Sequence, residues 1–180
     1  MIDEKRVLNG VKNVVLDLDG TLYNKRGLAR RMVRRLWWSL PLLAVDRLAH
    51  GRCWRWVVRT RWYRRIYLPT MVRMIGEGCS VREEVLQLIS ECRRKQIPMA
   101  VYSDYAFVPE KLRVLGIDAR QFALLIDSPT LGARKPSREA AMKLLSMLHA
   151  EPETTLFVGD REDTDGETAR LVGAKFMLVN

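Results

Sequence analysis

Two acidic residues, separated by a single leucine, follow an apolar run near the start of the chain. Val14 to Leu16 leads into Asp17, Leu18 and Asp19, and a glycine and a threonine follow. In extended backbone alternate side chains lie on the same side, so both carboxylates are expected to face one site. Two such carboxylates repel each other unless a cation lies between them, and Mg²⁺ prefers oxygen ligands. The pair therefore predicts a metal site where one carboxylate attacks phosphorus and the other handles a proton.

Three further segments place polar residues at a strand end or a helix start. Ser103 ends an apolar run, and a hydroxyl there can donate a hydrogen bond to a phosphoryl oxygen. Lys135 precedes a proline that opens a predicted helix, where a fixed ammonium can neutralise phosphate charge. Asp160 follows another apolar run and begins an acidic loop that reaches Asp165. Each segment alone also fits a surface turn or a helix cap, but their order along one α/β chain favours a phosphoryl-transfer enzyme.

Together these segments resemble the motifs of the haloacid dehalogenase superfamily of phosphatases. The run from Asp17 to Leu22 is similar to the first motif of that family. The resemblance implies that Asp17 is the nucleophile and that Asp19 is the general acid/base, with both residues binding Mg²⁺, Asp19 through its backbone carbonyl. The presence of the second acid favours a phosphatase over a dehalogenase. By the same resemblance Ser103 and Lys135 match the second and third motifs and bind the phosphoryl group.

The acidic loop after residue 159 resembles the fourth motif of the family. The resemblance implies that Asp160 binds Mg²⁺ directly and that Asp165 orients metal-bound water or the lysine. Asp163 is the alternative to Asp165, because the spacing of this motif varies. Two more residues complete the predicted site. We group Asp104 with the phosphate-binding residues because it follows Ser103, although its chemistry suggests no specific role. Thr21 is expected to support the first motif by a local hydrogen bond.

The elements that position these residues alternate between short apolar runs and helical patterns. This alternation predicts an α/β fold with a doubly wound parallel sheet, similar to a Rossmann fold. Ser80 followed by Glu83 has the pattern of a capping box at the start of the first helix of this part of the chain. The predicted strands cover residues 14–18, 98–102, 122–126, 155–158 and 175–179, and the predicted helices cover residues 80–95, 109–115, 136–148 and 166–172.

Residues 24–75 differ sharply in composition from the rest of the chain. They contain 14 Lys and Arg residues, one acid (Asp46) and all five tryptophans, whereas the remainder holds 17 basic and 20 acidic residues. We expect two helices here, over residues 28–48 and 53–74, with Pro41 breaking or kinking the first. The family resemblance covers residues 11–23 and 80–179 and implies a cap domain inserted between them. The predicted domains are therefore a catalytic core of residues 1–23 and 79–180 and a helical cap of residues 24–78.

The basic, tryptophan-rich composition of the predicted cap is compatible with three uses. It fits a helical cap whose arginines attract anionic phosphate substrates in solution. It also fits a cap that lies on an anionic membrane, which would make the substrate a lipid-linked phosphate. A nucleic-acid-binding surface is the third use, and the apolar stretch at residues 40–45 makes it less favoured. The alternative function is a catalytically weak binding protein that docks this cap on anionic membrane or nucleic acid.

The bulk properties fit an intracellular globular protein with a phosphorylated substrate. The chain has 180 residues, a net charge of +10 and 48% apolar residues. No uncharged run reaches the roughly 18 residues of a membrane span, and the polar residues 1–10 do not resemble a signal peptide. The three cysteines are odd in number and lack a CxxC pair, which predicts reduced thiols and a cytoplasmic location. The sequence does not indicate an oligomeric state.

Overall fold

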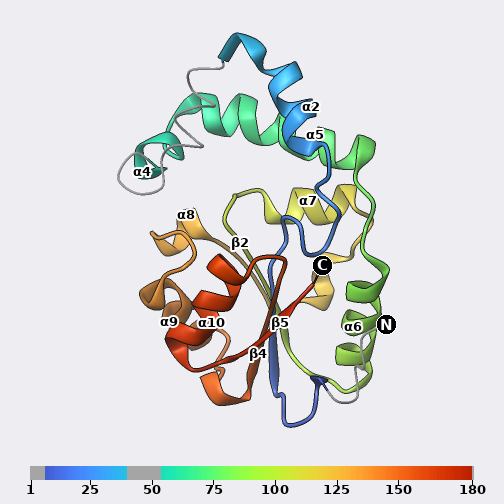
Figure 1. Cartoon of the computed structure of the whole chain (residues 1–180), viewed down its shortest axis with the longest axis vertical. Helices are drawn as coiled ribbons and strands as arrows, with labels where there is room; N and C mark the ends of the chain where they lie inside the picture. The colour runs from blue at the N-terminus through green and yellow to red at the C-terminus, as the bar shows by residue number, and fades with distance from the viewer. Residues whose placement is uncertain (1–6, 40–53, 180) are drawn as a thin grey trace.

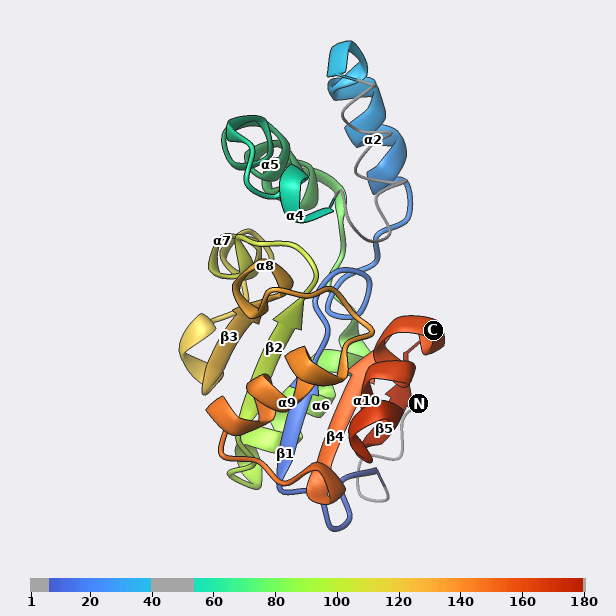
Figure 2. The same ribbon diagram turned by 90° about the vertical axis from the view of Figure 1, so that its left-hand side faces the viewer.

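The chain folds around one sheet of five parallel strands. The computed structural model describes residues 7–39 and 54–179. The strands lie in the order β3-β2-β1-β4-β5, and Figure 2 shows them side by side. This arrangement confirms the predicted parallel α/β sheet. The bounds of the strands are β1 Asn13–Leu16, β2 Met99–Ser103, β3 Leu124–Asp127, β4 Thr155–Gly159 and β5 Lys175–Leu178.

Helices cover both faces of the sheet because alternate strand residues point to opposite sides. Val14 and Leu16 of β1 pack in one core with α6 (Glu83–Arg94) and α7 (Val108–Val114). Val15 packs in the other core with α9 (Arg138–Met147) and α10 (Glu167–Val172). Figure 1 shows the sheet edge-on between α9 and α10 on one side and α6 on the other. The central strands β1, β2 and β4 are buried on both faces, which explains their continuous apolar sequence. A short helix that the sequence did not predict, α8 Ser128–Leu131, follows β3.

The register of the strands places their carboxyl ends at one edge of the sheet. Leu16 of β1 pairs with Val101 of β2 and with Val158 of β4. The residues that follow these strands, among them Asp17 and Asp160, therefore emerge next to each other. Residues that are far apart in the sequence meet here because parallel strands all end on the same side.

Helices of residues 24–39 and 54–78 lie beyond this edge of the sheet (Figure 1), and these two described ranges are called the insert below. The insert contains α2 Leu28–Arg35, a 3₁₀ turn Trp37–Ser39, α4 Trp54–Val57, a π-helical segment Tyr63–Tyr67 and α5 Leu68–Gly78. Arg31 of α2 donates hydrogen bonds to the carbonyl oxygens of Met74 and Gly78, at 3.4 and 3.1 Å. A cation at the carboxyl end of α5 interacts favourably with the dipole of that helix, and these hydrogen bonds join the two helices. The predicted break at Pro41 lies outside the described residues.

The two linkers of the insert run past each other where they leave and rejoin the core. Tyr23 and Val81 form an isolated antiparallel bridge, and the Asn24 N–H donates to the Ser80 carbonyl at 2.9 Å. The ends of the insert are therefore held side by side above the sheet.

The predicted start of the first core helix was wrong. The helix α6 begins at Glu83, and its N-cap residue is Arg82 rather than Ser80. The reason is the pairing of the linkers: Val81 lies in the bridge, and the Arg82 N–H donates to the Leu22 carbonyl at 3.0 Å. These contacts keep the backbone extended up to Arg82, so the helix cannot begin earlier.

Candidate active site

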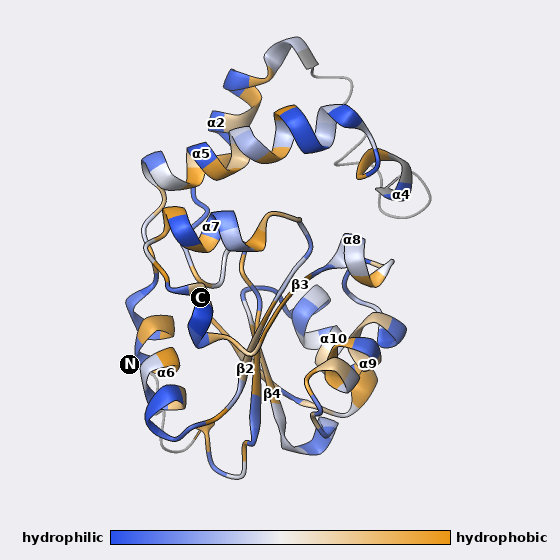
Figure 3. Cartoon of the chain, turned by 180° about the vertical axis from the view of Figure 1, so that it is seen from behind, coloured by the Kyte–Doolittle hydropathy of each residue, from blue (hydrophilic) through white to orange (hydrophobic). Residues whose placement is uncertain are grey.

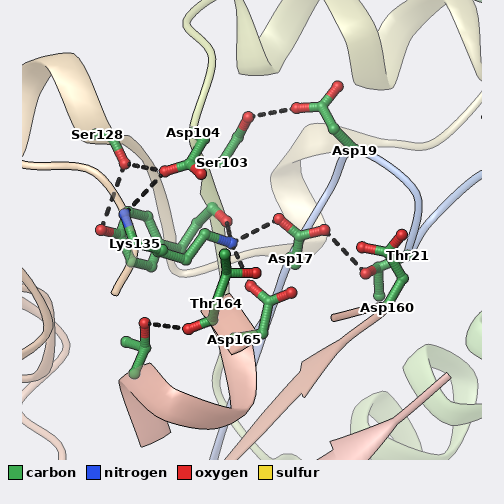
Figure 4. Close-up of polar contacts among 12 residues, drawn as sticks. Asp17, Asp19, Thr21, Ser103, Asp104, Ser128, Lys135, Asp160, Thr164 and Asp165 are labelled. Carbon is green, nitrogen blue, oxygen red and sulfur yellow. Dashed lines mark hydrogen bonds and ion pairs between the residues drawn. The ribbon is translucent and has the colours of Figure 1, made fainter. Parts of the chain in front are cut away.

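Asp17 lies directly after β1 and is buried at the carboxyl edge of the sheet. Its Oδ1 accepts a hydrogen bond from the Lys135 ammonium at 2.6 Å, and its Oδ2 accepts one from the Thr21 hydroxyl at 2.8 Å (Figure 4). The turn that brings Thr21 back to Asp17 requires glycine at position 20, where φ is +114°. A Cβ at Gly20 would also lie 2.3 Å from Asp160 Oδ2, so the first motif and the acidic loop are in close contact.

Lys135 joins three segments of the site through its buried ammonium. Besides Asp17, the ammonium donates to Asp165 Oδ1 at 2.6 Å and to the Tyr102 carbonyl at 3.1 Å. Burial alone would lower the pKa of Lys135, but Asp17 and Asp165 outweigh burial and raise it above its ordinary value. Lys135 is therefore a permanent cation facing the carboxylate that the sequence predicts as nucleophile.

Asp104 holds the loop that carries Lys135. Its Oδ1 accepts from the backbone N–H of Lys135 at 3.1 Å and from the Ser128 hydroxyl at 2.6 Å (Figure 4). The sequence analysis grouped Asp104 with the phosphate-binding residues, and Asp104 lines the same pocket as Asp17 and Lys135. Its contacts give it a part that the sequence did not predict, which is to fix the position of Lys135.

The acidic loop after β4 places only some of its acids at the site. Asp165 is buried beside Lys135, whereas Asp163 forms an ion pair with Arg161 and its side chain is 68% exposed. A π-helical turn, Glu162–Gly166, adds one residue to the loop and turns Asp165 inward. Of the two alternatives left open by the sequence, Asp165 is the one that contacts Lys135.

Asp19 points away from Asp17 and is held by three donors. The Tyr23 hydroxyl donates to Oδ1 at 2.7 Å, and the Ser103 hydroxyl and the Lys111 ammonium donate to Oδ2 at 2.6 and 2.7 Å. Burial would raise the pKa of Asp19, but the charge and hydrogen bonds of Lys111 outweigh it and lower the pKa below its ordinary value. Asp19 is therefore a carboxylate here, and Ser103 is engaged with it.

Lys111 and Tyr23 are site residues that the sequence reasoning missed. Lys111 is fully buried, yet it lies on α7 and not in any of the four motif segments. One signal was present: Lys111 stands three residues after Val108 and directly before Leu112, on the apolar face of its helix. A lysine on a buried helix face needs a partner charge, and Asp19 supplies it.

Three carboxylates gather where a metal ion could bind. One oxygen from each of Asp17, Asp160 and Asp165 lies within 4.8 Å of the others. Burial, together with the charges of Asp165 and Asp19, raises the pKa of Asp17 to about 7 against the opposing effect of Lys135. The cluster thus carries surplus negative charge, and its all-oxygen donors suit Mg²⁺. The residues present fit the metal that the sequence predicts.

Lys25 of the first linker also reaches this cluster. Its ammonium lies 2.5 Å from Asp160 Oδ2 and donates to the backbone carbonyl of Asp19 at 3.1 Å. These are two of the oxygens that the resemblance assigns to Mg²⁺. The Lys25 ammonium therefore lies beside oxygens that are predicted to bind the metal.

The match to known proteins agrees with this geometry. The family model of haloacid dehalogenase-like hydrolases matches residues 11–173. The chain belongs to the haloacid dehalogenase-like hydrolase family. Among curated proteins, it is 40% identical over 58 residues to the phosphoglycolate phosphatase of Aquifex aeolicus (strain VF5). That match spans 32% of this chain and 27% of the length of the Aquifex protein.

Solved structures share the fold of this haloacid dehalogenase-like chain. A phosphatase of the family from Thermococcus onnurineus superposes with a TM-score of 0.71 at 16% identity, covering 94% of this chain and 86% of that one. CbbY from Rhodobacter sphaeroides, solved in complex with phosphate, gives 0.72 at 20% identity, covering 93% and 85%. At these identities the likeness establishes the fold.

The remaining sequence expectations concern location and cysteine chemistry. In residues 7–39 and 54–179, no helix is long and apolar enough to cross a membrane. Cys79 is half-buried and Cys92 is buried. Cys53 lies outside the described residues.

Proposed function

We propose that this member of the family is a Mg²⁺-dependent phosphomonoester hydrolase that works through an aspartyl-phosphate on Asp17. The observation that carries the proposal is the contact of the buried Asp17 carboxylate with Lys135 and Thr21 at the floor of a pocket. A carboxylate fixed beside an ammonium can approach an anionic phosphoryl group that the same ammonium binds. The cavity measures about 370 Å³, which is enough for a small phosphorylated molecule.

In the proposed first step, an Asp17 oxygen forms a bond to phosphorus and the bond to the leaving oxygen breaks. Lys135 binds phosphoryl oxygens, and Ser103 is proposed to do so after turning from Asp19. Asp19 gives a proton to the leaving oxygen. In the second step, water attacks phosphorus, its proton passes to Asp19, and the bond between phosphorus and Asp17 breaks to release phosphate.

The contacts of Asp19 suit the second step better than the first. Lys111 keeps Asp19 ionised, which is the form that accepts a proton from water. To act as the acid in the first step, Asp19 must acquire a proton and give up its bond to Lys111. We therefore propose that the Asp19 side chain moves between Lys111 and the leaving group during turnover.

The metal would be held by the carboxylates of Asp17 and Asp160 and by the backbone carbonyl of Asp19. When bound, Mg²⁺ neutralises charge on the phosphoryl group and orients it for attack. Asp165 is proposed to support this site through Lys135, and Thr21 through its hydrogen bond to Asp17. The insert is proposed to act as a cap, because it forms part of the pocket wall above these residues.

The test is phosphate release from an aryl phosphate, with Mg²⁺ and with a chelator. We expect turnover only with the metal, and none in Asp17→Asn. The matched control is Asp163→Asn, which removes an exposed acid of the same site region and should keep activity. Near-normal turnover of Asp17→Asn would contradict the assignment of Asp17 as the nucleophile.

A membrane-docking role for the insert has its own support. Trp37 and Trp38 are 68% and 55% exposed, and Arg34 and Arg35 end the helix just before them. Exposed tryptophans beside cations suit the headgroup region of an anionic membrane, where a lipid-linked phosphate would be presented. Co-sedimentation with vesicles tests this role. Salt-sensitive binding to anionic vesicles but not to neutral ones is expected, and equal binding to both would contradict it.

The same surface supports the alternative of a catalytically weak binding protein. Absence of turnover on every phosphate tested, together with binding to anionic vesicles or nucleic acid, would favour that alternative over the hydrolase.

A further inference from the structure

The pocket above Asp17 has two chemically different halves. Its floor is polar and charged, with Asp17, Lys135 and Asp160 among its residues. Its upper wall comes from the insert and is mostly apolar. Figure 3 shows the apolar segments of α2 and α5 above the sheet. The apolar residues of the insert that line the pocket are Leu28, Ala29, Met32 and Val33 of α2 and Met71 of α5.

Aromatic rings continue this apolar wall down to the site. Tyr67 of the insert and Tyr105 of the core both line the pocket, with ring centroids 6.3 Å apart. Tyr67 also stacks on Tyr63 at 5.4 Å, with an angle of 16° between the rings. The wall is thus supported from behind and joins the insert to the core.

The basic residues of α2 do not form this wall. Arg30, Arg34 and Arg35 are exposed, and none of the three lines the pocket. Among the described residues of the insert, the polar side chains on the pocket belong to Lys25, which contacts Asp160, and to Tyr67. A leaving group rich in hydroxyls would therefore lose water in this half of the pocket and gain few hydrogen bonds.

We propose that the pocket selects phosphomonoesters whose leaving group is an apolar chain or ring, in preference to sugar or glycerol phosphates. This inference rests on the proposed hydrolase function and names its substrate class. The phosphoryl group would lie against Asp17 and Lys135, and the apolar group would lie between α2, α5 and Tyr105. Each methylene group that enters the wall should strengthen binding about fourfold, because burial of one CH₂ is worth about 0.8 kcal/mol.

The first experiment measures kcat/KM with Mg²⁺ for ethyl, butyl, hexyl and octyl phosphate and for glycerol 3-phosphate, all below their micelle concentrations. We expect kcat/KM to rise with chain length until the cavity is filled, and glycerol 3-phosphate to be among the poorest substrates. Equal values along the series, or a preference for glycerol 3-phosphate, would overturn the inference while leaving the hydrolase function intact.

A binding measurement separates this inference from the proposed function. Titration calorimetry on Asp17→Asn compares octyl phosphate with glycerol 3-phosphate in a protein that cannot turn them over. Tighter binding of octyl phosphate supports the apolar wall even if no phosphate is hydrolysed by the native chain. Equal or weaker binding of octyl phosphate contradicts it.

Substitutions within α2 test the wall directly. Val33→Thr replaces one methyl group by a hydroxyl of similar size, and Ala29→Ser adds a hydroxyl at a more exposed position. Val33→Thr should reduce the preference for octyl over ethyl phosphate by about fivefold, since a hydroxyl left unpaired against the bound chain costs about 1 kcal/mol. Ala29→Ser should reduce it less, because water can still reach the hydroxyl of an exposed residue. Arg30→Ser is the matched control, because Arg30 lies on the same helix away from the pocket. An unchanged preference in Val33→Thr, or an equal loss of preference in Arg30→Ser, would refute the placement of the apolar leaving group against α2.

Vesicles that contain phosphatidic acid distinguish the source of the apolar phosphate. Hydrolysis of both phosphatidic acid and octyl phosphate supports a lipid source, and hydrolysis of octyl phosphate alone supports a free one. Hydrolysis of glycerol 3-phosphate with neither apolar substrate overturns the inference.

Discussion

The buried pair of Lys111 and Asp19 allows a sharp test of how the site is held together. The Lys111 side chain is 0% exposed and that of Asp19 is 10% exposed, with 2.7 Å between Nζ and Oδ2. Lys111→Met keeps an unbranched side chain that is one atom shorter and removes its charge. It leaves Asp19 with the hydrogen bonds from Tyr23 and Ser103 alone.

The expected loss of stability is large for a single substitution. Breaking a buried ion pair by removing one partner typically costs about 3–5 kcal/mol, because the other charge stays buried without compensation. Asp19 keeps two neutral donors, so we expect a loss near the lower end, about 3 kcal/mol. Denaturant unfolding near neutral pH measures this free energy. Lys143→Met is the control, since both members of its pair with Glu139 are exposed and the loss should be much smaller.

The pH dependence has a definite sign. Lys111 lowers the pKa of Asp19 in the folded protein, so the pair stabilises the fold above the ordinary pKa of 3.8 and loses its effect as pH falls through the folded pKa. The gap between the native protein and Lys111→Met should therefore shrink in acid. The double variant Lys111→Met with Asp19→Asn should recover most of the loss. A loss under 1 kcal/mol, or no recovery in the double variant, would refute the reasoning.

Three further predictions concern the carboxylate cluster. Because the pKa of Asp17 is raised to about 7, its contribution to the stability of the chelator-treated protein should be lost as pH rises through that value. Asp17→Asn should then be the more stable protein in denaturant above that pH, and a less stable one would contradict the prediction. Lys25→Met should tighten the binding of Mg²⁺ alone by up to about fivefold, as measured by calorimetry. The metal must displace the Lys25 ammonium from Asp160, and a half-exposed ion pair contributes at most about 1 kcal/mol. Weaker binding would show that Lys25 instead supports the metal ligands. Gly20→Ala should lower the unfolding free energy by about 1–3 kcal/mol, since alanine is strained at this φ and its Cβ meets Asp160. Gly132→Ala, also at positive φ but with open space around its Cβ, separates backbone strain from the clash.

The fold could be predicted from the sequence because its signals are local. Each central strand is a short apolar run, and parallel strands must end on one side of a sheet. This rule is sufficient to bring Asp17, Asp160 and Ser103 to one edge without any knowledge of packing. Lys135 was predicted from a lysine before a helix-opening proline, but α9 begins at Arg138 with Ser137 as its N-cap, so Pro136 does not open the helix. The backbone of Lys135 is held by Asp104 instead.

The rest of the site depends on contacts between distant segments. The pairing of Lys111 with Asp19 arises because α7 packs against the loop after β1, and no local pattern encodes that approach. The choice between Asp163 and Asp165 depends on a single π-helical turn, which the spacing of acids does not reveal. Ser80 failed as a helix cap for the same reason, because the partner that keeps its neighbours extended comes from the other linker.

The bridge between Tyr23 and Val81 also affects how such a protein can change over time. Segments whose two ends are neighbours can be lengthened, shortened or replaced without displacing the flanking chain. Here the flanking chain includes Asp17 on one side and α6 on the other, and both stay fixed to the sheet. A different helical unit grafted between these linkers would leave the reacting carboxylate where it is. Recognition and chemistry can therefore diverge independently within one polypeptide.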